Sequence, residues 1–439
     1  MSSSTGTSIY AEHLAERQRK VEVALTDSGY DALVISSGKP FTYFADDQDA
    51  PFRETAHFAH WVPLRGPSHL LLLRPGTKPR LVRVAPEDYW YEQAPLGAPF
   101  WADDFDLHEV TSVEAAWKLA RANGRVAYIG DEPELAKSNG IDASALNPAA
   151  LVSRLDWERS FKSAYEVACM EEAQRVAAWG HRAALAAFDK GASELEIHHA
   201  YVQACGCTEE ALPYPTIIGH DEKAAILHYT GKRTQRDGRV LLIDAGAKHL
   251  GYASDITRTW TRKECDADFR ELVKGMDKLQ RKLCDKVVPG LPYPDLHAAA
   301  HVMIGDLLRE VGVLRVSGDD AFEVGLTSAF FPHGLGHFLG IQVHDVSGRQ
   351  KEPAGGVVPP PAKSPYLRTT RTIAEDQVFT IEPGCYFIEM LLREHRVGPH
   401  SALVDWTVVD RLAPFGGVRI EDNVLVTAAG HRNLTRPNI

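Results

Sequence analysis

Four apolar stretches with the composition of β-strands each contain a carboxylate. They are RVLLIDAGAK with Asp244, YASDITRTW with Asp255, QVFTIEPGCYFI with Glu382 and VRIEDNVLVT with Glu421. Acidic residues are depleted in strands, and a buried carboxylate without a partner is costly. A fold that buries these strands must therefore place the acids at turns or edges, or neutralise their charge. This requirement restricts the fold more than any other feature of the sequence.

The first two acids lie on a predicted β-hairpin. Gly246 and Gly251 offer a reversal between the two runs, and antiparallel pairing can bring Asp244 and Asp255 together on one face. Buried like charges a few ångströms apart cannot both stay ionised without a cation. The alternative is that each aspartate caps a turn at the end of the sheet.

The same pattern recurs downstream with Glu382 and Glu421, although each alone could be a solvated residue of an edge strand. A glycine-rich segment, PHGLGHFLGIQVHD, adds His333, His337 and His344. One imidazole among four carboxylates suits two divalent ions about 3.5–4 Å apart that activate a water. We expect two divalent metal ions per subunit, Mn²⁺ first, with Co²⁺ or Zn²⁺ as alternatives.

The length of 439 residues exceeds one ordinary core, so we expect two or three domains in an α/β (α+β) fold. A boundary within NPAALVSRLDWERSFK separates residues 1–160 from residues 161–439. In the first part, the apolar pattern predicts a helix near 9–28, a helix from 112 that ends at Gly124, and strands at 32–38, 68–75, 80–85 and 125–131. The long aromatic and acidic loop 40–63 favours a functional or interface role.

Helix signals are clear in the second part. Two capping boxes, Ser163 with Glu166 and Ser193 with Glu196, predict helices that run to about residues 188 and 205. Further helices are predicted at 266–287 and 294–311, and strands over the four runs that carry acids.

Composition excludes several classes of protein. The net charge is −11 and the basic residues are scattered along the sequence, so the chain lacks the cluster of Lys and Arg that is typical of a nucleic-acid-binding protein. No run of about 18 apolar residues predicts a membrane span. The start of the chain has no apolar core of a signal peptide, so we expect a cytoplasmic protein with no membrane partner. The six cysteines are irregularly spaced, which predicts reduced thiols.

The motifs resemble those of the pita-bread metallopeptidases (M24-like), most closely their bacterial proline dipeptidase (prolidase) branch. The resemblance rests on DAGAKHLGYASDITRTW, PHGLGHFLGIQVHD, FTIEPG and GGVRIEDNV in this order, supported by AYEVACMEEA, ILHYT and SPYLRTTR. It covers nearly the whole chain. It implies a small creatinase-like N-terminal domain with dimer contacts, a C-terminal pita-bread catalytic domain, and a homodimer.

The resemblance also implies which residues bind the metal. Asp255 and Glu421 would bridge two ions, and Asp244 would complete the coordination of one of them. His337 and Glu382 would complete the coordination of the other. Only one of the three histidines in the glycine-rich segment is then a ligand.

The other two, His333 and His344, would line the pocket, where an imidazole can donate a hydrogen bond to the substrate or to a developing oxyanion. His228 in ILHYT and Arg419 resemble the family's substrate-contacting pair. By residue type alone, His228 could instead be a core histidine whose hydrogen bonds are satisfied.

Three further residues match positions that contact substrate in the family. Arg368 resembles the arginine that holds the prolyl carboxylate, a task suited to a planar bidentate donor. Tyr214 matches a pocket tyrosine, and Asp47 matches a residue that reaches the site of a neighbouring subunit. Alternatively, Arg368 pairs with a surface acid and Tyr214 only packs.

By this resemblance the protein hydrolyses dipeptides with C-terminal proline, a metal-dependent reaction in which Glu382 transfers the proton. An aminopeptidase P that acts on longer peptides and a metal-free binding module with the same fold are the alternatives. Relatives also cleave organophosphorus esters, which implies a side activity. Cys385 after the IEPG turn and KHL in the hairpin depart from the family pattern but change no ligand.

Overall fold

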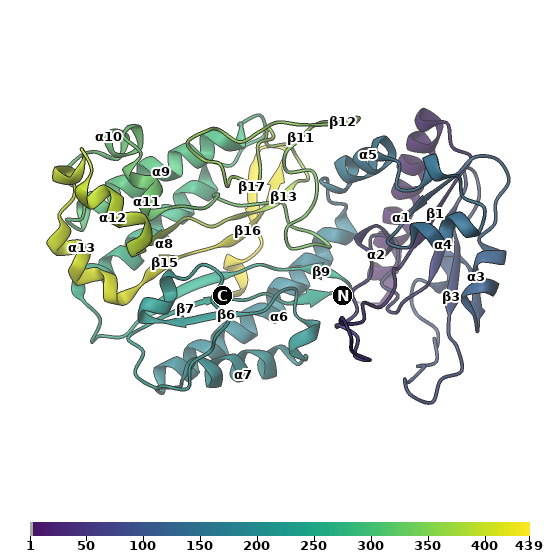
Figure 1. Cartoon of the computed structure of the whole chain (residues 1–439), viewed down its shortest axis with the longest axis horizontal. Coiled ribbons are helices and arrows are strands. Elements are labelled where there is room, and N and C mark those ends of the chain that lie inside the picture. The colour runs from purple at the N-terminus through teal and green to yellow at the C-terminus, as the bar shows by residue number, and fades with distance from the viewer. Residues whose placement is uncertain (1–2) are drawn as a thin grey trace. The chain divides into compact units, whose positions relative to one another are not determined.

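The computed structural model describes the backbone from Ser3 and the side chains from Ser8 to Ile439. Two compact units are present. The first comprises the chain up to Arg159 with residues 163–165 and 352–356, and the second comprises the remainder. In Figure 1 the first unit is purple to blue and the second is mostly teal to yellow. Both units combine helices and strands, as predicted for an α/β (α+β) fold.

The first unit is built on a mixed sheet of five strands in the order β4-β3-β2-β1-β5. The pairs β1–β2 and β2–β3 are antiparallel, whereas β1–β5 and β3–β4 are parallel. Every residue of β1 and β2 is buried, which explains their unbroken apolar sequences ALVIS and LLLL. The strands are β1 (Ala32–Ser36), β2 (Leu70–Leu73), β3 (Arg80–Val84), β4 (Asp106–Val110) and β5 (Val126–Ile129).

Several details of this unit differ from the sequence prediction, among them the helix Ala149–Arg159, which lies in the segment expected only as a boundary. The helix expected to end at Gly124 ends at Leu119, whose carbonyl accepts a hydrogen bond from Arg80 Nη1 at 3.1 Å. Strand β4 was not predicted, because it is a partly exposed edge strand with the polar sequence DLHEV. The helices are α1 (Ser3–Ser28), α2 (Ala56–Ala59), α3 (Val113–Leu119), α4 (Pro133–Ser138) and α5 (Ala149–Arg159), with 3₁₀ turns η1 (Ala102–Asp104) and η2 (Ala143–Ala145).

The predicted helices of the second part are confirmed. Helix α7 begins with the predicted capping box, in which Ser193 Oγ accepts from the Glu196 N–H and Glu196 accepts from the Ser193 N–H. Four short helices that follow α9 were not predicted. The helices are α6 (Ala164–Asp189), α7 (Glu194–Cys205), α8 (Ala267–Asp285), α9 (Tyr293–Glu310), α10 (Gly318–Glu323), α11 (Leu326–Phe330), α12 (Glu389–Val397) and α13 (Trp406–Leu412).

The second unit contains two three-stranded sheets, β10-β7-β6 and β13-β16-β17, and the pairs β14-β15 and β8-β9. In Figure 1, α8 and α9 lie on one side of these strands and α6 and α7 on the other. One apolar cluster joins Phe269 and Leu272 of α8, Ile304 of α9, Phe379 of β13 and Val424 of β16.

These elements have the following bounds: β6 (Ile217–His220), β7 (Val240–Asp244), β8 (Lys248–His249), β9 (Tyr252–Ala253), β10 (Thr257–Thr261), β11 (Gln350–Glu352), β12 (Gly355–Val357), β13 (Val378–Ile381), β14 (Gly384–Tyr386), β15 (Gly417–Arg419), β16 (Asp422–Thr427) and β17 (Gly430–Asn433). Short 3₁₀ turns are η3 (Glu209–Ala211), η4 (Asp221–Ala225), η5 (Ser401–Leu403), η6 (Ala413–Phe415) and η7 (Arg436–Asn438). Within the described part of the chain, no helix has the length and apolar character needed to cross a bilayer.

Candidate metal centre

Each of the four acids in the strand-like runs lies where a strand ends or is interrupted. Asp244 is the last residue of β7, and Asp255 lies between β9 and β10. Glu382 separates β13 from β14, and Glu421 separates β15 from β16. The runs therefore read as single strands in sequence but break at the acid, which explains how acidic residues occur within apolar stretches.

Strand register aligns these positions across the unit. In the antiparallel pair of β7 and β10, Thr257 lies opposite Asp244. Thr257 also forms a β-bridge with Glu421. In the next pair Ile381 of β13 lies opposite Asp422, and because the pair is antiparallel, Glu382 after Ile381 and Glu421 before Asp422 extend the same register. Carboxylates that are far apart in the sequence consequently lie side by side.

Three of the five predicted ligands form a compact buried cluster. Asp255, His337 and Glu421 each offer a ligand atom within 4.8 Å of the other two. His337 Nε2 lies 3.4 Å from Asp255 Oδ2 and 3.6 Å from Glu382 Oε1, so Glu382 adjoins the cluster. The backbone N–H of His337 donates a hydrogen bond to Thr380 Oγ1 at 3.1 Å, which fixes this part of the chain.

Asp244 adjoins the cluster through Tyr214, whose hydroxyl lies 2.8 Å from Asp244 Oδ1 and 2.5 Å from Asp255 Oδ1. The second oxygen of Asp244 accepts a hydrogen bond from Arg419 Nη2 at 2.6 Å. Tyr214, predicted as a pocket residue, therefore contacts two predicted ligands in this structure.

The acids of the site repel one another. Burial, and then the charges of Asp255, Glu382 and Asp244, raise the pKa of Glu421 well above its ordinary value. Burial raises the pKa of Glu382 to about 7. Burial and repulsion from Asp255 raise the pKa of Asp244 to about 6.

Asp255 and His337 form the exception, because they stabilise each other's charge. Burial opposes ionisation of Asp255, but hydrogen bonds with His337 and Tyr214 and the charges of His337 and His344 together outweigh it, so the Asp255 pKa is lowered. The pKa of His337 is raised for the same reason, against the effect of its burial.

His333 lies on the other side of Glu382, with Nδ1 3.7 Å from Glu382 Oε2. Its Nε2 is 2.8 Å from the Tyr386 hydroxyl, which also accepts a hydrogen bond from Arg419 Nη1 at 2.8 Å. Burial, and then the charge of Arg419, lower the pKa of His333 to about 3, so the ring is neutral. Tyr386 was not predicted, although the sequence places it four residues after Glu382.

The remaining candidates of the second unit surround this core. The ring of His344 packs edge-on against His337, with centroids 4.4 Å apart. Desolvation, and then the charges of His337 and Arg368, lower the His344 pKa. The charge of His228 contributes to the lowered pKa values of both His333 and His344, so it lies within electrostatic range of both.

Asp47 belongs to the first unit, whereas every other predicted site residue belongs to the second. It lies in an exposed loop, and its N–H donates a hydrogen bond to Asp46 Oδ1 at 2.7 Å.

The donor set fits a divalent metal. Its atoms are carboxylate oxygens and one imidazole nitrogen, the ligands that such ions take in proteins. Burial, and then the charges of Asp255, Glu382 and Asp244, disfavour the ionised form of Glu421, and a bound cation would favour it. A buried cluster of carboxylates and one imidazole is typical of metal-dependent enzymes, which is the class of protein that the fold and the site indicate.

Comparisons with known proteins agree with this class. Residues 168–428 match the model of metallopeptidase family M24, and residues 8–157 match the model described as Xaa-Pro dipeptidase, N-terminal domain. The chain is 41% identical over 434 residues to a Xaa-Pro dipeptidase of Pseudoalteromonas atlantica, covering 98% of each chain. It is 42% identical over 433 residues to one of Stenotrophomonas maltophilia, covering 98% of this chain and 97% of the relative.

Solved structures show the same fold. A Zn-substituted Escherichia coli aminopeptidase P in complex with product has a TM-score of 0.72 at 22% identity, covering 98% of this chain and 96% of the other. Proline aminopeptidase P II from Yersinia pestis has a TM-score of 0.71 at 22% identity, covering 98% and 97%.

The chain belongs to metallopeptidase family M24. The expected pita-bread fold and the resemblance stated from the motifs are thereby confirmed, and the protein is a metal-dependent peptidase that binds a divalent metal.

Proposed function

We propose that the protein is a Xaa-Pro dipeptidase that hydrolyses dipeptides with C-terminal proline. The observation that carries the proposal is the buried Asp255–His337–Glu421 cluster in a chain that aligns along 98% of its length with Xaa-Pro dipeptidases. A prolyl amide is tertiary and lacks an N–H, so peptidases that bind that hydrogen handle it poorly.

Two divalent ions are proposed for each subunit, with Mn²⁺ as the first choice and Co²⁺ or Zn²⁺ as alternatives. Asp255 and Glu421, together with Asp244, His337 and Glu382, would hold the ions. Bound ions would supply a Lewis acid for the scissile carbonyl and lower the pKa of the attacking water. Support comes from the short distances among these side chains and from the charge that they concentrate.

Glu382 is proposed as the general base that accepts the proton of the attacking water and delivers it to the departing proline nitrogen. Its carboxylate lies between His337 and His333, at 3.6 and 3.7 Å. His333 and His344 would donate hydrogen bonds to the developing oxyanion. In this structure His333 Nδ1 lies 2.8 Å from the Gly334 carbonyl, so the one N–H of the neutral ring donates there, and donation to the oxyanion would require that hydrogen bond to break.

Substrate binding is proposed for His228, Arg368 and Arg419 in the second unit. The exposed Arg368 would hold the carboxylate of the prolyl residue with two hydrogen bonds and so exclude longer peptides. Tyr214 would shape the pocket and also orient Asp244 and Asp255. Asp47 would act in the site of a neighbouring subunit.

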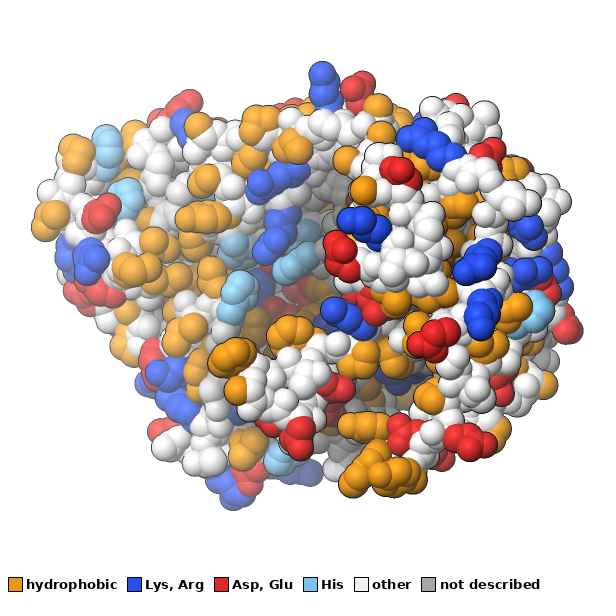
Figure 2. Space-filling view, turned by 45° about the vertical axis from the view of Figure 1, so that its right-hand side comes forward, with side chains coloured by type: hydrophobic (Ala, Val, Ile, Leu, Met, Phe, Trp, Pro, Cys, Tyr) orange, Lys and Arg blue, Asp and Glu red, His pale blue; other side chains and the backbone are white. Residues whose placement is uncertain are grey.

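Residues 1–160 are proposed as a creatinase-like domain that supplies dimer contacts, and residues 161–439 as the catalytic domain of a homodimer. The first unit exposes several large aromatic side chains, among them Phe44 (100% exposed), Tyr89 (88%) and Trp90 (76%). Hydrophobic side chains also gather at the lower edge of the face in Figure 2. Exposed apolar patches of this kind mark contact surfaces.

A cytoplasmic location is proposed as well. The six cysteines are irregularly spaced in the sequence, which is typical of reduced thiols rather than of a disulfide framework.

A panel of peptides tests the proposed substrate. After chelation and readdition of Mn²⁺, Co²⁺ or Zn²⁺, the protein should cleave a Xaa-Pro dipeptide much faster than a tripeptide with proline second. The reverse preference would establish an aminopeptidase P instead, and a protein without stoichiometric metal would be a binding module. A phosphotriester in the same panel tests the proposed side activity on organophosphorus esters.

A further inference from the structure

Asn423 lies two residues beyond Glu421 and contacts the backbone of Asp255. The β-bridge between Thr257 and Glu421 is antiparallel, so continuing its register places Asn423 opposite Asp255. The backbone groups of Asn423 already have other partners. Its N–H donates to Thr435 Oγ1 at 2.9 Å, and its carbonyl accepts from the Leu434 N–H at 2.8 Å.

The side chain of Asn423 takes over the pairing that its backbone cannot make. The Asp255 N–H donates to Asn423 Oδ1 at 3.0 Å, and Asn423 Nδ2 donates to the Asp255 carbonyl at 2.5 Å. A carboxamide offers the same donor and acceptor as a peptide group, so it can extend a β-ladder by one step. We call these two hydrogen bonds the 255–423 amide pair.

Neighbouring side chains fix the orientation of the amide. Gln174 Nε2 donates to Asn423 Oδ1, and Gln174 Oε1 accepts from Thr435 Oγ1 at 2.8 Å. Gln174, Asn423 and Thr435 are all buried. Rotating the amide would leave several buried polar atoms without partners, which is costly.

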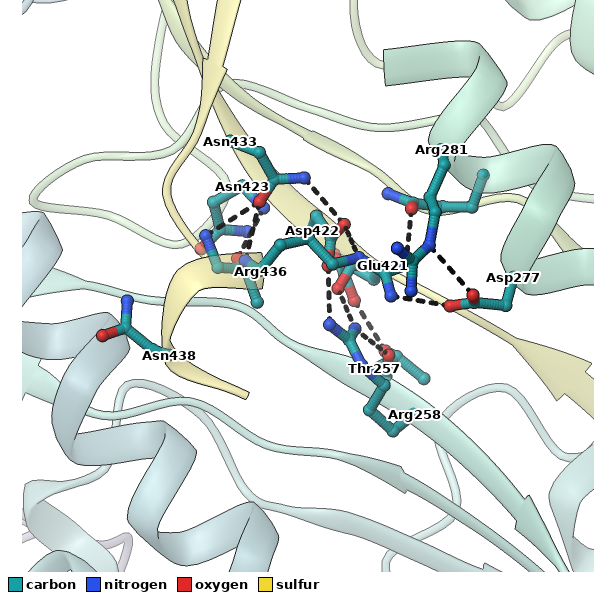
Figure 3. Close-up of polar contacts among 12 residues, drawn as sticks. Thr257, Arg258, Asp277, Arg281, Glu421, Asp422, Asn423, Asn433, Arg436 and Asn438 are labelled. Atoms are coloured by element: carbon teal, nitrogen blue, oxygen red, sulfur yellow. Dashed lines mark hydrogen bonds and ion pairs between the residues drawn. The ribbon is translucent and has the colours of Figure 1, made fainter. Parts of the chain in front are cut away.

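Glu421 and Asp422 are anchored by further contacts, several of them from Thr257 and Arg258 on the segment that follows Asp255. Thr257 Oγ1 donates to Glu421 Oε2 at 2.6 Å, and Arg258 Nη1 donates to the Glu421 carbonyl at 2.7 Å. Asp422 accepts from Arg258 Nη2 and Arg436 Nε at 2.7 and 2.6 Å. Figure 3 shows these contacts on both sides of the segment that carries Glu421.

We propose that Asn423 is a positioning residue that sets the spacing between Asp255 and Glu421 and thereby the affinity of the site for divalent metal. The Thr257–Glu421 bridge aligns the two segments two residues beyond Asp255, and the 255–423 amide pair aligns them at Asp255 itself, so it holds the Asp255 carboxylate at its distance from Glu421. The proposal rests on the ligand assignment of the proposed function and does not depend on which peptide is cleaved.

The test is a titration of the metal-free, full-length protein with Mn²⁺ by isothermal calorimetry. Asn423→Leu keeps a branched side chain of similar size and adds no charge, but it removes both hydrogen bonds. It should raise the dissociation constant for Mn²⁺ by ~10- to 100-fold, the range seen when groups that orient metal ligands are removed. With metal at saturation, KM for the substrate should stay unchanged.

Asn147→Leu is the matched control, because Asn147 of the first unit makes the same two hydrogen bonds with Gly130, accepting from its N–H at 3.0 Å and donating to its carbonyl at 2.9 Å. This variant should lose thermal stability and keep the dissociation constant for Mn²⁺. Equal Mn²⁺ affinity in folded Asn423→Leu and in the wild type would overturn the proposal.

If Asn423→Leu does not fold, Gln174→Met decides the question. Loss of its contact with Asn423 should weaken Mn²⁺ binding in the same direction by a smaller factor, and an unchanged affinity would overturn the proposal. A wild type that binds Mn²⁺ but cleaves no Xaa-Pro dipeptide would refute only the proposed substrate.

Discussion

At the scale of single residues, the sequence predicted the acids of the site because they violate the pattern of their surroundings. A carboxylate within an apolar run is visible without a structure, and so is a cluster of histidines among glycines. Tyr386 and Asn423 were missed because a tyrosine and an asparagine are unremarkable in their runs. Both acquire a role only through strand register, which brings Tyr386 to Arg419 and Asn423 to Asp255.

Replacing Glu382 by Gln should reduce kcat by ~10²- to 10⁴-fold, because the amide cannot accept the proton of the attacking water. The side chain keeps nearly the same volume, so the protein should fold. Steady-state kinetics with a Xaa-Pro dipeptide measures the effect, and Glu375→Gln, at an exposed position, is the matched control. Near-normal turnover in the Glu382 variant would contradict the assigned role.

Metal affinity should depend on pH. In the metal-free protein the pKa values of Asp244 and Glu382 are raised to about 6 and about 7. Below these values both acids hold protons that an incoming ion must displace. The apparent affinity for Mn²⁺ should therefore rise as pH increases from 5 to 8, as measured by titration across that window. A flat profile would show that neither acid binds the metal.

At the scale of elements, long periodic helices and capped starts were predictable, whereas short helices and strand breaks were not. Helix α7 carries its capping box in the sequence, but α10 to α13 are too short to show a period. The interruptions at Glu382 and Glu421 depend on neighbouring strands from distant parts of the chain. The sequence thus predicted which runs form the sheets but not where each strand ends.

The ion pairs in Figure 3 tie the strands of the site to α8. Asp422, which is fully buried, pairs with Arg258 and Arg436, and Arg436 Nη1 contacts Asp277 of α8 at 2.6 Å. Arg258→Met should lower the free energy of unfolding by about 3–5 kcal/mol, because it leaves a buried charge short of a partner. Urea denaturation of the metal-free protein measures this value. A loss below about 1 kcal/mol would mean that Arg436 alone satisfies Asp422.

At the scale of the whole molecule, the proposed homodimer should depend on the exposed aromatic residues of the first unit. The wild type should have twice the chain mass of 48.4 kDa by light scattering. Phe44→Ser combined with Trp90→Ser should shift the protein toward the monomer. Val397→Ser changes an equally exposed apolar residue of the second unit and should not. A wild-type monomer would rule out the dimer.

The central claim is that acids from four separate strand ends can share one buried site because divalent cations neutralise them. An anomalous difference map, recorded at the manganese absorption edge from crystals grown with Mn²⁺, tests it most directly. We predict two peaks in each subunit, both within coordination distance of Asp255 and Glu421. Side chains that remain as close without any peak between them would contradict the account.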